Sequence, residues 1–194
     1  NTLGDWFTAQ TLPAVSYVQS RLPQPGALLA LDAVIAVQPI SAGHPQLGQV
    51  PPTARAIGGA TYSVMPRGDV IYISGQAQPG DLLQATTATL QGLQETLQHL
   101  KLGLESISHL KCFLDPISRA AEVEETISQF FGALPRPPVS HVEWTAGSLP
   151  IEIELVVYVG AAESAESVES ITTPGLSPSP VFSRVVRLHG DHRI

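Results

Sequence analysis

The chain has few of the residues that mark a secreted or nucleic-acid-binding protein. It contains one cysteine, Cys112, so it cannot form an intrachain disulfide, and nothing indicates an oxidising compartment. It has 10 Lys and Arg residues against 17 Asp and Glu residues, a formal net charge of -7. With no run of basic residues, this charge argues against binding to nucleic acid. There is no signal peptide and no apolar run of membrane-spanning length. We therefore expect a soluble cytoplasmic protein that binds neither nucleic acid nor membranes.

Potential metal ligands are also sparse. His189, Asp191 and His192 lie close together in the sequence, but in a turn near the C-terminus such side chains are most often solvated. No other cluster of ligand residues suggests a metal site, so we expect no metal.

Charged residues are scarce, at 14% of the chain. A surface with so few charges suggests that other subunits cover much of it, although Pro- and Gly-rich loops are an alternative explanation. The hydrophobic fraction of 43% is ordinary for a globular protein and sufficient for a core of normal size.

Two sequence patterns occur twice, far apart. PAVSYV at 13–18 resembles PPVSHV at 137–142, and each run continues through a Leu-Pro step into a long apolar strand, at 28–37 and 151–159. Near the other end of the chain, a Phe-Ser pair at 182–183 is followed by a Gly-Asp pair at 190–191. This order resembles the Tyr-Ser pair at 62–63, which is followed by a Gly-Asp pair at 68–69.

Because repeats decide architecture before local features do, we infer one complete unit between two partial ones. The N-terminal piece resembles the final hairpin of a unit, and the C-terminal piece resembles the first strand of another. The predicted segments are 1–38 for the N-terminal hairpin, 39–55 for a linker, 56–162 for the complete domain, 163–179 for an acidic, Ser- and Pro-rich linker, and 180–194 for the C-terminal strand.

The complete unit alternates strands and helices. Leu90, Leu93, Leu97 and Leu100 have the 3-4-3 spacing of one helical face, and Gly103 is a plausible end for that helix. The sequence of this unit predicts helices at 81–102 and 120–131 and a strand at 109–115. It also predicts a hairpin at each end, of strands at 61–66 and 70–75 and of strands at 138–144 and 151–160. In the N-terminal piece it predicts strands at 13–21 and 28–38.

The order β-β-α-β-α-β-β predicts an α+β fold in which two helices cover one face of a mixed sheet. Tyr72 and Ile73, and likewise residues 156–158, are apolar at adjacent positions, which is typical of strands buried on both faces. Two helices can cover only one face. We therefore expect another copy of the same sheet to cover the other.

Several motifs of the middle unit resemble the RidA family, also called YjgF/YER057c/UK114, over about residues 56–160. They occur in the family's order and spacing. The motifs are Tyr62-Ser63, GDVIYISGQ at 68–76, Gln84, HLKCFLD at 109–115, FFGALPRPPV at 130–139 and LPIEIELVVYV at 149–159. The resemblance implies a RidA-like, chorismate-mutase-like fold and a homotrimer with its sheets in a central barrel and its sites between subunits.

The resemblance also implies an activity, the hydrolysis of reactive 2-imino or enamine acids to 2-oxo acids and ammonia. Such a substrate carries a planar carboxylate, and Arg136 offers a rigid two-pronged donor that matches it. The C=N carbon needs a water molecule that a carboxylate holds and deprotonates, and Glu152 is the candidate. In this resemblance Arg136 and Glu152 are the catalytic pair.

The remaining site residues also come from the resemblance. Tyr62 is similar to the tyrosine at the family's cleft, and Ser74, Gly75 and Gln76 are similar to the stretch that lines it. With Arg136 they form the predicted binding site for a small carboxylate substrate.

The same residues could instead have structural roles. Arg136 lies between prolines and could form a salt bridge with a neighbouring subunit. Glu152 alternates with apolar neighbours and could be a solvated strand residue, while Tyr62 and Gln76 could serve packing alone. Cys112 lies in an apolar strand, which favours an inert core thiol over a nucleophile.

The partial copies lack the proposed functional side chains. Leu12 and Ala30 stand at the positions of Arg136 and Glu152, and Phe182 stands at the position of Tyr62. We therefore expect the flanking pieces to be structural. A non-catalytic module that binds a small carboxylate or serves assembly is the alternative function, while a ribonuclease fits poorly with the net charge of -7.

Overall fold

The computed structural model describes residues 21–23, 26–27, 30–35, 37, 40, 43–50, 60–145, 148–160, 164 and 166–190. The helices in these ranges are α1 (Leu82–His99) and α2 (Ala120–Phe131), with the short 3-10 helices η2 (Leu104–Ser106) and η3 (Ile117–Arg119). The strands are β1 (Gln46–Val50), β2 (Ala60–Val64), β3 (Asp69–Gln76), β4 (Ile107–Leu114), β5 (Val139–Glu143), β6 (Ile151–Gly160), β7 (Val168–Ile171) and β8 (Val185–Leu188).

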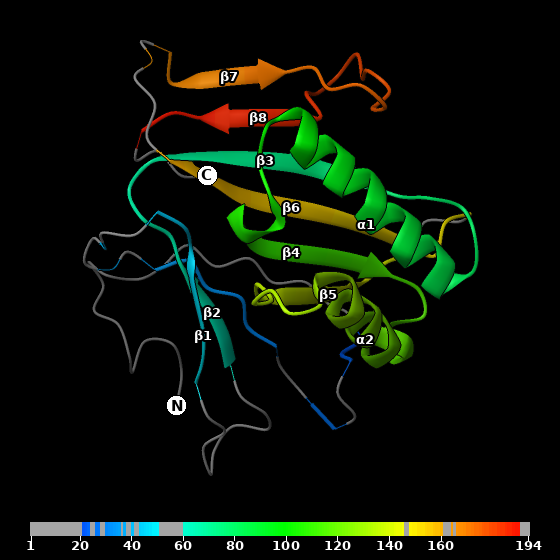
Figure 1. Cartoon of the computed structure of the whole chain (residues 1–194). Helices are drawn as coiled ribbons and strands as arrows, with labels where there is room; N and C mark the ends of the chain where they lie inside the picture. Colours follow the sequence, from blue (N-terminus) through cyan, green and yellow to red (C-terminus); the bar gives the residue numbers. More distant parts are fainter. Residues whose placement is uncertain are drawn as a thin grey trace, which may run out of the picture.

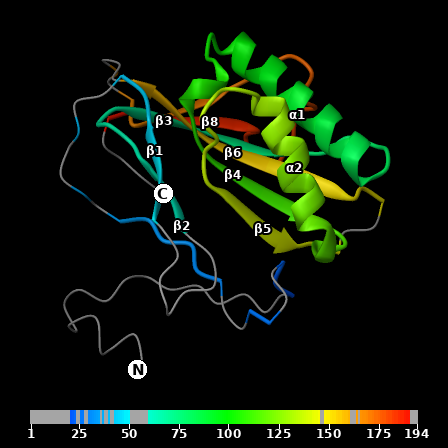
Figure 2. The same ribbon diagram turned by 60° about the horizontal axis from the view of Figure 1, so that its bottom comes forward.

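The strands form a six-stranded sheet and a separate two-stranded one. The large sheet has the order β5-β4-β6-β3-β8-β7, and β1 pairs with β2. Strands β4 and β5 run parallel, whereas the other neighbours in the large sheet run antiparallel. Both helices lie on one face of the large sheet, as Figures 1 and 2 show from two directions. The predicted α+β fold, with two helices on one face of a mixed sheet, is confirmed.

Helix α1 begins with a reciprocal cap. The Asp81 carboxylate accepts hydrogen bonds from the backbone N–H groups of Leu83 and Gln84, at 3.1 and 3.0 Å, while the Gln84 side chain accepts one from the Asp81 N–H. Such a capping box satisfies backbone donors that the first turn leaves without partners. The helix ends at His99, earlier than the predicted residue 102, because Lys101 adopts a left-handed backbone with φ of 61°.

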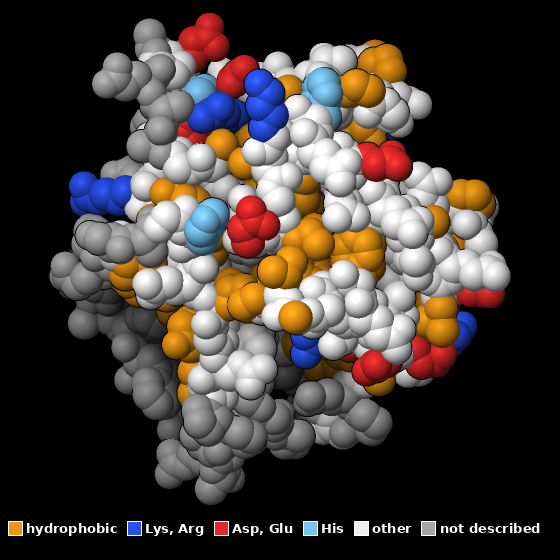
Figure 3. Space-filling view, in the orientation of Figure 1, with side chains coloured by type: hydrophobic (Ala, Val, Ile, Leu, Met, Phe, Trp, Pro, Cys, Tyr) orange, Lys and Arg blue, Asp and Glu red, His pale blue; other side chains and the backbone are white. Residues whose placement is uncertain are grey.

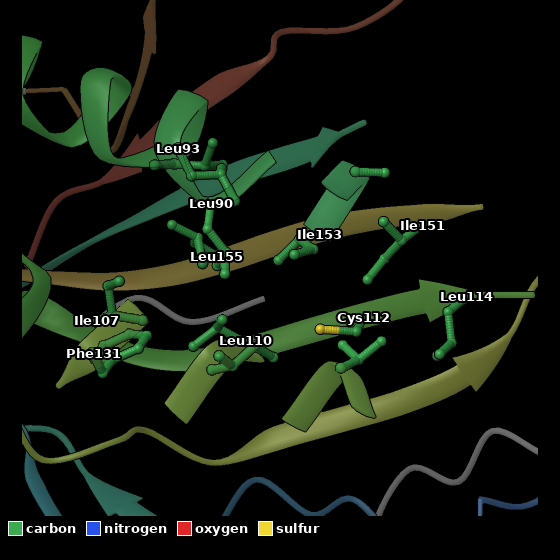
Figure 4. Close-up of a cluster of buried hydrophobic side chains, with 14 of the residues drawn as sticks. Leu90, Leu93, Ile107, Leu110, Cys112, Leu114, Phe131, Ile151, Ile153 and Leu155 are labelled. Atoms are coloured by element: carbon green, nitrogen blue, oxygen red, sulfur yellow. The ribbon is translucent and has the colours of Figure 1, made fainter. Parts of the chain in front are cut away.

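The two helices bury the faces that the sequence pattern predicts. Leu90, Leu93 and Leu97 of α1 are at most 3% exposed. Helix α2 spans the predicted residues and buries Val123, Ile127 and Phe131, which lie four residues apart. Figure 4 shows Leu90 and Leu93 above β6, and Cys112 among the apolar side chains of the core. The Cys112 thiol is fully buried, and burial strongly raises its pKa.

Both predicted hairpins of the complete unit are wrong. The strands predicted at 138–144 and 151–160 do not pair with each other, because β4 lies between β5 and β6. Nor do residues 61–66 and 70–75 form a hairpin. Strand β2 pairs with β1 instead, with Tyr62 opposite Gly48. Strand β3 has β6 on one side and β8 on the other. The Gly-Asp turn signal at 68–69 is local, whereas the strands that flank β3 come from much later in the chain.

Three further predictions about the flanking segments need correction. Strand β1 lies within the predicted linker 39–55, and β7 lies within the predicted linker 163–179. Their half-exposed, polar sequences lack an apolar alternation, so periodicity does not reveal them. The predicted strand at 28–38 is absent from the described residues 30–35 and 37. Of the predicted strand at 13–21, residues 13–20 lie outside the described ranges.

The sheet face away from the helices is only partly covered. Tyr72, Phe113 and Val156 are half-buried there in the single chain, on the face that we expect another copy of the sheet to cover. Asp32, from the described part of the N-terminal segment, accepts a hydrogen bond of 2.5 Å from Ser140 of β5. Ser140 pairs with Lys111, which is also half-buried. This N-terminal segment therefore approaches the sheet near its β5 edge.

Candidate functional site

Glu152 projects from β6 onto the sheet face that the helices leave open. Its neighbours Ile151 and Ile153 are fully buried in the core, and strand residues alternate between faces, so Glu152 points away from the helices. Its side chain lies against the backbone of Gly75 on β3, because a methyl group added to Gly75 would overlap the Glu152 carboxylate. The structure thus brings together the predicted site residues Gly75 and Glu152.

The Glu152 carboxyl has a raised pKa. Partial burial is the main cause, the negative charge of Glu154 adds to it, and the positive charge of Arg184 opposes both. A carboxylate that binds its proton more tightly than usual is a better general base at neutral pH. The open sheet face therefore carries a carboxyl group whose pKa is shifted towards neutral pH.

Ser74 and Gln76 flank Gly75 and have different environments. The Ser74 hydroxyl is buried and has no hydrogen-bond partner among the described residues. The Gln76 side chain is also buried, and its amide donates a 3.0 Å hydrogen bond to Thr96 of α1. Gln76 therefore joins the strand to the helix above it, while Ser74 lies half-buried one residue before the Glu152 contact.

Tyr62 and Arg136 lie elsewhere in the chain. The Tyr62 ring lies against Gly48 in the two-stranded sheet, and the residue is 45% exposed. The Arg136 guanidinium forms a 3.1 Å ion pair with Glu124 of α2. Since α2 covers the face opposite to Glu152, one chain does not bring Arg136 and Glu152 together.

Arg136 lines a cavity of about 420 Å³ beside α2. Its lining residues are Pro23, Ala120, Ala121, Glu124, Glu125, Ser128, Arg136 and His141. Burial raises the pKa of Glu124, although the charge of Arg136 opposes it, and burial lowers the pKa of His141 to about 4. At neutral pH the cavity wall thus carries a neutral imidazole beside an ion pair.

The sequence pattern missed a charged cluster that attaches β8 to β3. The Asp69 carboxylate is fully buried and accepts hydrogen bonds from Arg187 Nε at 2.8 Å, His189 Nδ1 at 2.7 Å and the Gly190 N–H at 2.8 Å. The sequence signs that these regions are related were the resemblance of the Gly-Asp pairs at 68–69 and 190–191 and that of the Tyr-Ser and Phe-Ser pairs before them. These signs did not indicate that the two regions meet.

The sequence pattern also missed Arg184, which precedes β8. Its carbonyl accepts a 2.8 Å hydrogen bond from the Ser74 N–H, and its charge acts on Glu152. No local motif marks it.

Two general features hold for the described part of the chain. It contains no group of three or more His, Cys, Asp or Glu side chains that could hold a metal ion. It also contains no helix that is both long and apolar enough to cross a membrane.

The comparisons with known proteins identify the family. The family model described as endoribonuclease L-PSP matches residues 53–159, more than half of the chain. Together with the α+β sheet, this match defines the class. The chain belongs to the endoribonuclease L-PSP family, which includes the YjgF/UK114/RidA proteins. None of the curated proteins compared with the chain matches it.

Several solved structures are similar to the chain. A YjgF/YER057c/UK114 family member from Mycobacterium tuberculosis is 26% identical, with 59% of this chain and 100% of that chain covered and a TM-score of 0.43. TdcF from E. coli with bound serine is 20% identical, with 58% and 100% covered and a TM-score of 0.44. The YjgF gene product from E. coli is 20% identical, with 56% and 92% covered and a TM-score of 0.43.

Proposed function

We propose that the chain is a hydrolytic deaminase that converts small 2-imino acids, or their enamine tautomers, to 2-oxo acids and ammonia. Membership of the family supports this class of activity. The observation that carries the proposal is the half-buried Glu152 carboxylate against Gly75, on a partly open sheet face, with a raised pKa. No cofactor is required for this reaction.

Glu152 has two tasks in the proposed reaction. It first removes a proton from water as the water oxygen bonds to the C2 carbon of the iminium group, which gives a carbinolamine. It then returns the proton to the amino nitrogen, so that the C–N bond breaks and ammonia leaves. The hydroxyl proton passes to the departing ammonia as the 2-oxo group forms. A carboxyl group with a raised pKa suits both steps, because it exchanges protons near neutral pH.

The predicted Arg136 can take part in this site only across subunits. In its own chain Arg136 is paired with Glu124 beside α2, on the other side of the sheet from Glu152. A homotrimer with sites between subunits, as the family resemblance implies, could bring a second copy's Arg136 to the Glu152 face. We propose this assembly together with the activity.

A coupled assay tests the activity. An amino-acid oxidase generates the imino acid in situ, and release of the 2-oxo acid is followed with and without the protein. We expect the wild type to accelerate release, and Glu152→Gln to lower the rate by roughly 100-fold, the scale of general acid–base catalysis. Glu95→Gln is the matched control, since Glu95 is exposed on α1, on the other side of the sheet from Glu152. A wild-type rate equal to that of buffer would refute the proposal.

One observation favours a second candidate function. Because Arg136 is held by Glu124, the chain could bind a small carboxylate beside Glu152 without turnover. The same samples distinguish the two functions. Carboxylate binding without accelerated hydrolysis would support the binding module.

A further inference from the structure

The C-terminal segment places an arginine next to the proposed site. Arg184 lies outside residues 53–159, which the family model matches, and it immediately precedes β8. Strand β8 pairs antiparallel with β3, with Ile73 opposite Val185. The Ser74 N–H donates a 2.8 Å hydrogen bond to the Arg184 carbonyl, so the pairing continues by one residue and Arg184 lies opposite Ser74.

This pairing determines the face onto which Arg184 projects. Residues directly opposite each other in an antiparallel pair have their side chains on the same face. Ile73 and Val185 are at most 2% exposed and belong to the core beneath the helices. Ser74 and Arg184 come next along each strand and therefore project onto the opposite face. Glu152 of the neighbouring β6 projects onto that face too.

The Arg184 side chain is held in place by its own segment. Its Nε donates a 3.3 Å hydrogen bond to the Ser177 carbonyl, and its guanidinium lies 4.9 Å from the centre of the Phe182 ring. No acceptor among the described residues pairs with its two Nη groups. A planar guanidinium stacked on an aromatic ring keeps its outer N–H groups available for a carboxylate.

We propose that Arg184 binds the carboxylate group of the ligand, so that the C-terminal segment completes the site formed by Gly75 and Glu152. The ligand class is a small planar 2-oxo or 2-imino carboxylate, and this choice of ligand rests on the proposed function. The pairing of β8 with β3 places the Arg184 side chain on the same sheet face as Glu152, so a cation for the substrate carboxylate shares the face of the proposed base. Arg136 has no such position within the chain, because it pairs with Glu124.

Binding of 2-oxobutanoate to the full chain tests the proposal without requiring turnover. Titrations followed by NMR compare the wild type with Arg184→Ala, Arg184→Lys, Arg136→Ala and Arg119→Ala. Arg119 is the matched control, since it forms an exposed ion pair with Glu122 far along the chain from Arg184. We expect Arg184→Ala to raise the Kd at least tenfold, Arg184→Lys to recover part of the affinity because it keeps the charge, and Arg119→Ala to bind as the wild type does.

Two results would overturn the inference. One is wild-type affinity in Arg184→Ala, whatever the effect of Arg136→Ala. The other is failure of the wild type to bind the probe. The circular dichroism spectrum and the Tm of Arg184→Lys are compared with those of the wild type. If both are unchanged, a difference in Kd between these two proteins is not caused by loss of the fold.

The inference and the proposed function can fail separately. If the wild type binds 2-oxobutanoate, Arg184→Ala does not, and neither accelerates imino-acid hydrolysis, the carboxylate site stands and the deaminase is refuted. If the wild type is an active deaminase and Arg184→Ala has the same KM, the deaminase stands and the role of Arg184 is refuted.

Discussion

At the scale of single residues, the close approach of Glu152 to Gly75 gives the site its shape. The carboxylate occupies the space where any other residue at position 75 would place its Cβ. Position 75 requires glycine because a side chain would overlap the Glu152 carboxylate. Its φ angle is not in the left-handed region that favours glycine. The packing couples the position of the proposed base to the backbone of the neighbouring strand.

Gly75→Ala is therefore expected to lower deaminase activity by roughly 10- to 100-fold, because small displacements of a catalytic group have effects of this size. The added methyl group must displace the Glu152 carboxylate. Gly43→Ala is the control, since a Cβ at Gly43 meets no atom within 4 Å. The coupled assay compares the kcat of Gly75→Ala and of Gly43→Ala with that of the wild type. Equal activity in Gly75→Ala and the wild type would show that the carboxylate position is unimportant.

The pH dependence of activity follows from the raised pKa of Glu152. A base must be deprotonated, so kcat/KM should fall on the acid side, with its midpoint above the ordinary pKa of a glutamate, about 4.3. Removal of the Arg184 charge should move this midpoint higher still, because that charge favours the ionised form. Profiles of the wild type and Arg184→Ala measure both effects. A midpoint at or below the ordinary value would contradict the expectation.

The sequence predicted only part of the site at this scale. Gly75 and Glu152 stand in motifs of adjacent strands, so their proximity followed from the fold. Arg184 could not be found in this way, because its position depends on the pairing of β8 with β3 across a long stretch of chain. Whether Arg136 and Tyr62 contribute remains a prediction for the assembled protein.

At the scale of secondary-structure elements, the attachment of β8 to β3 depends on a buried carboxylate. Burial alone would raise the pKa of Asp69, but hydrogen bonds from Gly190, His189 and Arg187, together with the Arg187 charge, lower it overall. The ionised Asp69 is therefore stabilised in the folded chain. It neutralises the charge of β8 and satisfies a backbone N–H group at the strand's end.

Asp69→Asn should lower the free energy of unfolding by about 3 kcal/mol, the scale for breaking a buried ion pair. It removes the negative charge opposite Arg187 and leaves that guanidinium without its buried partner. Urea denaturation gives the change, and hydrogen exchange at the β8 amides shows whether it is local. Glu122→Gln, in the exposed pair with Arg119, is the control and should have no measurable effect. Protection of β8 that is unchanged in Asp69→Asn would contradict the proposed attachment.

The same carboxylate predicts a dependence of stability on acid. Because the folded pKa of Asp69 is below the unfolded one, its contribution is fully present above the unfolded value, about 3.9. It is lost as the pH falls through the folded value. The difference in Tm between the wild type and Asp69→Asn should therefore shrink below about pH 4. A difference that is constant from pH 6 to pH 2 would exclude this linkage.

The helices and the central strands could be predicted from the sequence because their signals are local. The leucines of α1 and the Val123, Ile127 and Phe131 series of α2 repeat at helical spacing. Strands β1 and β7 could not be predicted, because they are short and polar. The choice of β8 as the neighbour of β3 depends on the Asp69 cluster, which unites residues more than a hundred positions apart.

At the scale of the whole molecule, the sheet has one covered face and one partly open face. On the helical side, apolar side chains gather near the middle of the surface, with charged side chains scattered around them (Figure 3). On the other side, Tyr72, Phe113 and Val156 are only half-buried in a single chain. Apolar groups at such positions favour association, because contact removes them from water.

We accordingly expect a homotrimer, or a multiple of it, in solution. Light scattering coupled to size-exclusion chromatography should give three times the mass of the chain or a multiple of that value. Phe113→Glu places a charge on the proposed contact face and should shift the distribution towards the monomer. Glu122→Gln, on the exposed surface of α2, should leave the mass distribution unchanged. A monomeric wild type would contradict the assembly and with it any site that requires a second copy.

The pairing of β3 with β8 has a further consequence for synthesis of the chain. Asp69 and Gly190 are 121 positions apart, so the ribosome makes β3 long before β8, the strand that covers the edge of β3, and it also makes both helices and β6 before β8. During that interval the edge of β3 presents unpaired backbone groups, which can pair with other chains. The backbone groups at this edge of β3 therefore become paired only after β8 has been synthesised.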